Sequence, residues 1–157
     1  MTVTHATVAS GTDSGTGEIH KAEWNADHVV SLSSSMTQLA ADVTMTTAGT
    51  WYDGPVTGAL ATGTWLIFVS IAMSSASSAT QTVQIRDSSG TTYASAVGFC
   101  VAGGNNSLAL MAKVTGNGSK TFKASATSQV NGNLILAAAG FNGVGNNVST
   151  ITAVQIA

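Results

Sequence analysis

From residue 43 to its end, the chain is a series of short runs rich in Val, Ile, Thr and aromatic residues, separated by turns of Gly, Asn, Asp and Ser. No amphipathic pattern of helical length interrupts them. The predicted strands are 43–47, 55–60, 64–73, 80–87, 91–100, 106–115, 119–128, 133–139 and 148–156. Short strands at even spacing with Gly and Asn turns are typical of sandwiches, jelly rolls and barrels, so we expect an all-β fold.

The residues before this series form a predicted N-terminal arm, connector and neck at 1–42, ahead of a head domain at 43–157. In the neck, apolar residues recur at steps of three and four, as in a short coiled coil. These residues are Val29, Leu32, Met36, Leu39 and Val43. The serines between them are poor residues for a helix interior, so an extended neck between chains is the alternative. We expect the arm to be short and either extended or helical.

Charged residues make up only 8% of the chain, against about 25% in ordinary soluble domains. The mean hydropathy is +0.28. Membrane insertion does not explain this composition, because the longest apolar run, 65–73, has about nine residues and a spanning helix needs about 20. The N-terminus lacks the basic region and apolar core of a secretory signal, so we expect none. A surface covered by other subunits remains as the explanation.

Two predicted strands support that explanation, because both of their faces are apolar. Strand 64–73 has Trp65, Ile67, Val69, Ile71 and Met73 on one face and Leu66, Phe68 and Ala72 on the other. Strand 133–139 is similar. Side chains alternate between the faces of a strand, so something must cover an apolar outer face. We expect a symmetry-related copy in a closed homo-oligomer, with a trimer as the predicted form.

The sequence offers little for catalysis. Five of the seven carboxylates precede residue 43, and the other two, Asp53 and Asp87, lie in predicted turns, where Asp is common for conformational reasons. Common hydrolase, metalloprotease and phosphate-loop motifs are absent from the sequence. Cys100 lies in an apolar run and is predicted to be a buried hydrophobe. We therefore expect no enzyme and no cofactor. Because the net charge is −2 and the basic residues are scattered, we also expect no nucleic-acid partner.

The stretch 17–30, GEIHKAEWNADHVV, differs from the rest of the chain. If it were helical, a face with carboxylate and imidazole groups could bind a divalent ion. That set is His20, Glu23, Asp27 and His28. The alternative is a structural connector in which Trp24 anchors against a partner while the charges stay hydrated. We predict the connector and no metal site.

This stretch resembles a connector segment of tail-fibre and spike proteins of tailed phages and gene transfer agents. The segment after it is similar to the trimeric jelly-roll heads of the TNF-like and complement-type superfamily. The matching segments are ATGTWLIFVSIAM at 61–73, QIRDSSGTTYASA at 84–96, GSKTFKASA at 118–126 and STITAVQIA at 149–157. The resemblance implies a TNF-like jelly-roll head in a homotrimeric virion appendage, assembled in the bacterial cytoplasm and displayed on the particle surface.

The same resemblance implies attachment to host-surface polysaccharide and docking on other virion proteins at a capsid vertex, a portal or tail, or a spike base. The expected docking residues are Ile19, His20, Trp24, Asn25 and His28. Because the chain has no long shaft, a short head spike is favoured over a tail fibre. A purely architectural base or adaptor protein is the alternative. A secreted carbohydrate-binding module is disfavoured, because Trp24, Trp51 and Trp65 fall in the connector, a turn and a core-like strand.

Glycan contacts are expected on loops far from the stalk. If the connector and the C-terminus share the stalk end and successive strands alternate in direction, loops 140–147, 115–119 and 87–90 are distal. Loops 101–105 and 128–132 then face the particle. The predicted glycan-binding residues are Asp87, Asn117, Phe141, Asn142, Asn146 and Asn147. The alternative for each Asn and Gly is that tight turns need their backbone freedom.

Overall fold

The computed structural model describes residues 2–3, 28–29, 33–141, 144–147 and 149–157. The chain divides into two compact units, residues 1–33 and 34–157. In the first unit, strand β1 (Thr2–Val3) pairs antiparallel with β2 (His28–Val29). The second unit is the head, and it holds the other strands.

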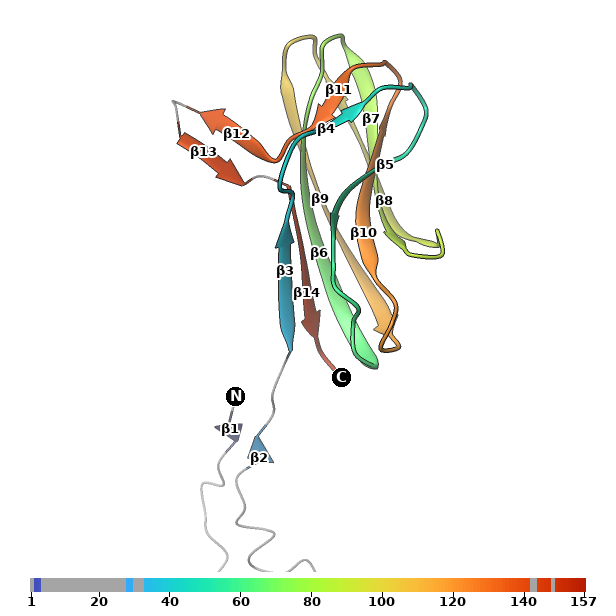
Figure 1. Cartoon of the computed structure of the whole chain (residues 1–157), viewed down its shortest axis with the longest axis vertical. Helices are drawn as coiled ribbons and strands as arrows, with labels where there is room; N and C mark the ends of the chain where they lie inside the picture. The colour runs from blue at the N-terminus through green and yellow to red at the C-terminus, as the bar shows by residue number, and fades with distance from the viewer. Residues whose placement is uncertain (1, 4–27, 30–32, 142–143, 148) are drawn as a thin grey trace, which may run out of the picture. The chain divides into compact units, whose positions relative to one another are not determined.

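The described part of the head contains two antiparallel sheets (Figure 1). The first sheet consists, in order, of β3 (Ser34–Gln38), β14 (Thr150–Gln155), β6 (Gly63–Ser74) and β9 (Asn105–Gly116). At the C-terminal end of β6, the short strands β11 (Asn133–Ile135) and β4 (Val43–Met45) extend this sheet. The second sheet consists, in order, of β5 (Tyr52–Val56), β10 (Phe122–Ser128), β7 (Ala79–Asp87) and β8 (Thr92–Cys100). A separate hairpin pairs β12 (Ala138–Phe141) with β13 (Val144–Asn147). The all-β jelly-roll sandwich is confirmed.

The core lies between the two sheets and follows the two-residue period of the strands. In β7 every second side chain from Ala79 to Asp87 is buried, because successive side chains of a strand point to opposite faces. The apolar residues without exposed surface are Ile67, Ile71, Met73, Val83, Ile85, Phe122, Ala124, Ala126, Ile135, Ile151 and Ala153. The outer face of each sheet therefore remains available for other contacts.

Strand β3 corrects the prediction for the neck. The heptad interpretation is wrong for residues 34–38, because they form a strand in which Met36 pairs with Thr152 and Thr37 with Ile151. Pairing with β14 gives this serine-rich segment its backbone hydrogen bonds, which a helix of poor helix formers would not hold as well. The compact head accordingly begins at Ser34.

The predicted strand 133–139 is interrupted. It contains β11 and the start of β12, and Leu136 and Ala137 between them are buried. The backbone N–H of Leu136 donates to the carbonyl of Ala72, and that of Ala137 donates to Asp42 Oδ1. Ala72, predicted to face a second copy, is only 3% exposed within the single chain. The chain itself therefore covers this end of β6.

The two ends of the sandwich carry different loops. Ser34 pairs with Val154, so the chain enters the head at the end where its last residues lie, here called the terminal end. Gly63 pairs with Gly116, and Asp87 with Phe122, which brings the turns 88–91 and 117–121 to the terminal end as well. The loops 75–78, 101–104 and 129–132 and the base of the β12–β13 hairpin lie at the other end, here called the opposite end (Figure 1).

This placement corrects the predicted loop arrangement. The prediction that 140–147 is remote from the terminal end holds for the base of the hairpin, but grouping 87–90 and 115–119 with it is wrong. Loops 101–105 and 128–132 are at the opposite end instead of the stalk side. The physical reason is that 133–139 is not a full-length strand, so counting it as one reversed the direction of every strand before it.

Candidate functional site

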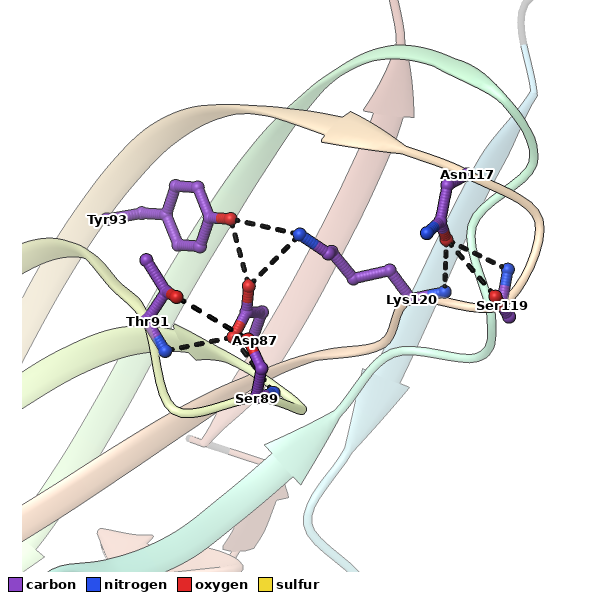
Figure 2. Close-up of polar contacts among 7 residues, drawn as sticks. All are labelled: Asp87, Ser89, Thr91, Tyr93, Asn117, Ser119 and Lys120. Carbon is purple, nitrogen blue, oxygen red and sulfur yellow. Dashed lines mark hydrogen bonds and ion pairs between the residues drawn. The ribbon is translucent and has the colours of Figure 1, made fainter.

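A buried carboxylate ties together two turns at the terminal end (Figure 2). Asp87, the last residue of β7, is 0% exposed. Its Oδ1 accepts hydrogen bonds from Ser89 N at 3.0 Å, Ser89 Oγ at 2.6 Å and Thr91 N at 2.9 Å. Its Oδ2 accepts from Tyr93 Oη at 2.9 Å and lies 3.1 Å from Lys120 Nζ. Both oxygens are therefore occupied within the chain.

The hydrogen bonds determine the charge state of this carboxylate. Burial raises the pKa of Asp87, but the hydrogen bonds from Ser89, Thr91, Lys120 and Tyr93 outweigh burial and hold it well below its usual range. The pKa of Lys120 is raised, first by its hydrogen bond to Asp87 and then by that to Tyr93. The two groups consequently remain an ion pair at neutral pH.

Asn117 belongs to the same assembly, because it shapes the turn that carries Lys120. Its Oδ1 accepts hydrogen bonds from Ser119 N at 3.1 Å and from Lys120 N at 2.7 Å. Short polar side chains commonly cap turns in this way. The structure therefore brings two of the predicted glycan-binding residues close to Lys120, but as parts of an internal network. The Asp87 carboxylate faces inward and is not available to a ligand in this arrangement.

The other predicted site residues are described only in part. Phe141, Asn146 and Asn147 belong to the backbone of the β12–β13 hairpin, and Asn142 lies outside the described residues. Of the predicted docking residues, His28 pairs through its backbone with Val3. The predictions for Ile19, His20, Trp24 and Asn25 lie outside the described residues.

The outer face of the first sheet carries an apolar row. Met36, Phe68 and Met111 lie on neighbouring positions of three strands, because Thr152 pairs with both Met36 and Phe68, and Phe68 pairs with Met111. All three side chains are exposed, Phe68 by 41% and Met111 by 59%. We call Met36, Phe68 and Met111 the face patch. Phe68 had been predicted to point out of the sandwich on an apolar outer face, and this is confirmed.

A second apolar group lies at the C-terminal end of β8, the edge strand of the second sheet, and on the residue that follows this strand. Val97, Phe99 and Val101 are exposed by 60–65%, and the first two alternate with half-buried residues along the strand. We call these three residues the edge patch. Together the two patches hold six of the eight large apolar side chains that are exposed in the described part of the chain. Monomeric proteins rarely expose apolar groups in such clusters, so both patches are candidate interfaces.

The outer face of the second sheet is polar over β5, β10 and β7, and on β8 it continues into Val97 and Phe99 of the edge patch. Asp53 lies on it, with Lys123 Nζ at 2.7 Å from Asp53 Oδ2 and Ser125 Oγ at 2.7 Å from Oδ1. Beside this pair, the Arg86 guanidinium carbon lies over the Trp51 ring, 5.7 Å from its centroid. Trp51 was predicted to lie in a turn, and its contact with Arg86 was not predicted from the sequence. A signal was available in the polar side chains that alternate with core residues along 82–86 and 123–127.

The described residues contain no group of three or more His, Cys, Asp or Glu side chains placed to hold a metal ion. Asp53 and Asp87 are the two acidic residues of 43–157. They point to opposite sides of the second sheet, because Asp53 lies on its outer face and Asp87 in the interior. Cys100 is 3% exposed and its Sγ lies 3.2 Å from the Gly104 carbonyl, which confirms the prediction that it is buried. Within the described part, no helix has the length and apolar character needed to cross a membrane.

The fold of the head is that of TNF-like jelly rolls. It is similar to the structure of Eiger TNF from S. frugiperda, with a TM-score of 0.58 and 11% identity over 80% of this chain and 93% of that chain. It is also similar to murine APRIL at pH 5.0, with a TM-score of 0.56 and 9% identity over 80% of this chain and 100% of that chain. At these identities the likeness is one of fold. No family model and no curated protein matches the sequence.

Proposed function

We propose that this chain is the head of a homotrimeric appendage on a phage-like particle, and that the head attaches the particle to polysaccharide on the host surface. The observation that carries the proposal is the pair of exposed apolar patches on two different sheets of a TNF-like head. The trimer, the particle and the polysaccharide are inferences from this observation, from the composition and from the connector at 17–30.

The positions of the two patches favour a ring of copies. The face patch lies on the outer face of the first sheet, and the edge patch lies on the last strand of the second sheet. When the face patch of one copy covers the edge patch of the next, the contact is heterologous, and such contacts close into a ring under cyclic symmetry. A ring would remove six exposed apolar side chains from water in each copy, and it accounts for the 8% content of charged residues.

The arrangement of the chain ends supports display on a particle. The chain enters the head at the terminal end, where Val154 also lies, and we propose that the opposite end is directed away from the particle. That end carries the loops 75–78, 101–104 and 129–132 and the base of the hairpin. The connector resembles those of phage and gene-transfer-agent spikes and fibres, and a virion protein is its proposed partner.

Deletion of residues 1–33 is expected to leave the head folded, with its thermal midpoint changed by less than about 3 °C, because these residues form a separate compact unit. The truncated protein should fail to join particles when it is produced in a particle-forming host. Trp24→Ala in the full chain should reduce incorporation, because a Trp anchor often contributes about 2 kcal/mol or more at an interface. Quantitative blotting of purified particles measures both effects, with His5→Ala as the control.

Adsorption of particles to host cells separates attachment from a purely architectural role. Particles without the head should adsorb poorly, and added soluble head should compete with intact particles. Normal adsorption without the head would contradict the attachment function and favour the architectural alternative. Normal incorporation of the truncated protein would contradict the proposed role of the connector.

A further inference from the structure

The outer face of β5, β10 and β7 presents charged and hydrogen-bonding side chains at adjacent positions. In the backbone register, Lys123 lies opposite Arg86, and Ser125 lies opposite both Gln84 and Asp53. Ser125 and Thr127 of the central strand have short side chains, so Trp51 on one side of the strand and Arg86 on the other can meet above it. With Arg86, Lys123 and Asp53, this face has two cations and one carboxylate.

Arg86 is the cation on this face without a carboxylate partner among the described residues. The ion pairs in this part of the chain join Lys120 to Asp87 and Lys123 to Asp53. The Nε atom of Arg86 is buried and has no hydrogen-bond partner among the described residues, and the same holds for Thr127 Oγ1. Native proteins rarely leave buried donors unpaired, so such groups together call for an explanation.

Trp51 lies beside both unpaired groups. Its ring is 5.7 Å from the guanidinium carbon of Arg86. Tyr52 pairs with Ala126 in the antiparallel register, which places the preceding Trp51 next to Thr127. Arg86 Nε and Thr127 Oγ1 are both buried and have no hydrogen-bond partner among the described residues. A ligand that supplied an acceptor here would satisfy groups that the chain itself does not.

The side chains define the chemistry of such a ligand. A guanidinium group binds a planar carboxylate through two parallel hydrogen bonds, for which its fixed fork of donors is suited. An indole ring offers a large flat apolar surface against which the apolar face of a sugar ring can pack. The neighbouring Ser, Thr and Gln side chains can bond sugar hydroxyl groups.

We propose that Trp51 and Arg86, with Ser125 and Thr127 between them, form a binding site for an acidic saccharide, in which Arg86 binds a sugar carboxylate and Trp51 packs against a sugar ring. This inference rests on the proposed function, because it names the class of polysaccharide and the place where it binds. The site lies on the same outer face as Val97 of the edge patch, because Val97 pairs with Thr82 and Thr82 pairs with Thr127. The site therefore borders the proposed interface, with Trp51 on the far side of β10 from the edge patch. An open sheet surface suits an extended chain of sugars.

Calorimetric titration of the full-length protein with a galacturonic acid hexasaccharide tests the site. The matched neutral probe is the same oligosaccharide with its carboxylates reduced to hydroxymethyl groups. The acidic probe is expected to bind roughly tenfold or more tightly than the neutral one, and added salt should weaken its binding. Arg86→Gln should remove this preference, whereas Trp51→Ala should weaken binding of both probes by roughly tenfold.

Two further variants control for charge and for geometry. Lys113→Gln removes one positive charge from the other sheet and should bind as the unaltered protein does, while Arg86→Lys keeps the charge but loses the fork and should bind more weakly. Light scattering and circular dichroism establish that each variant is folded and assembled. Equal binding of the two probes, no binding by the unaltered protein, or full affinity in Arg86→Gln would overturn the inference. Normal adsorption of particles that carry Arg86→Gln would contradict this site and leave the attachment function intact. Loss of adsorption with Arg86→Gln, but not with Lys113→Gln, would support both.

Discussion

Phe68→Asp is expected to convert the proposed trimer into a folded monomer. Phe68 is 41% exposed at the middle of the face patch, so the substitution leaves the core of the head intact. In the proposed ring, however, the carboxylate would be buried against the apolar edge patch of the next copy without a partner. We expect each contact to weaken by on the order of 100-fold, which corresponds to about 2.8 kcal/mol.

Light scattering coupled to size exclusion measures this effect directly. The unaltered protein should elute at about 47 kDa, three times the chain mass of 15.7 kDa, and the variant at the mass of one chain. Phe99→Asp in the edge patch should act in the same way, because each contact uses both patches. Gln129→Glu, which adds a negative charge to an exposed loop, is the control. A monomeric unaltered protein at micromolar concentration, or a trimeric Phe68→Asp variant, would contradict the assembly through these patches.

Asp87→Asn is expected to lower the free energy of unfolding by about 3 kcal/mol, because it breaks a buried ion pair. Asn has one acceptor oxygen in place of two, so it leaves Tyr93 or the backbone N–H groups of the turn opposite an amide NH2 group. For a head of this size, the expected fall in thermal midpoint is roughly 10 °C. Asp53→Asn is the matched control: the Asp53 and Lys123 side chains are 47% and 25% exposed, and a surface pair of this kind contributes about 1 kcal/mol or less.

The same variant should differ in its response to acid. The pKa of Asp87 is lower in the folded head than the ordinary value near 3.8, so its ionisation stabilises the head fully above that value. This stabilisation is lost as the pH falls from about 4 toward the lower pKa of the folded state. Denaturant titrations between about pH 6 and pH 2 should show that Asp87→Asn has the flatter pH dependence. Parallel pH profiles, or equal losses of stability in Asp87→Asn and Asp53→Asn, would contradict the role of the buried pair.

Local features of the sequence predicted much of the fold. The predicted strands 80–87, 91–100 and 106–115 match β7, β8 and β9. The alternation of apolar and polar residues along 83–86 matches the alternating burial of β7, because that alternation is a property of the strand itself. The apolar outer face of β6 at Phe68 was predicted from the alternation of faces along 64–73, and the burial of Cys100 from the apolar run around it. Likewise, the conformational explanation for Asp87 and Asn117 in turns agrees with their hydrogen bonds to nearby backbone N–H groups.

The tertiary structure decided what depends on contacts between distant residues. Ser34–Gln38 became a strand because β14, more than a hundred residues later, offers an edge to pair with. Residues Leu136 and Ala137 interrupt a predicted strand because they bond Ala72 and Asp42, and this interruption determines which loops share an end. Trp51, which directly precedes β5, and Arg86 of β7 meet because both strands pair with β10. Periodicity reports which face of a strand a side chain occupies, whereas the order of strands in a sheet decides which side chains become neighbours.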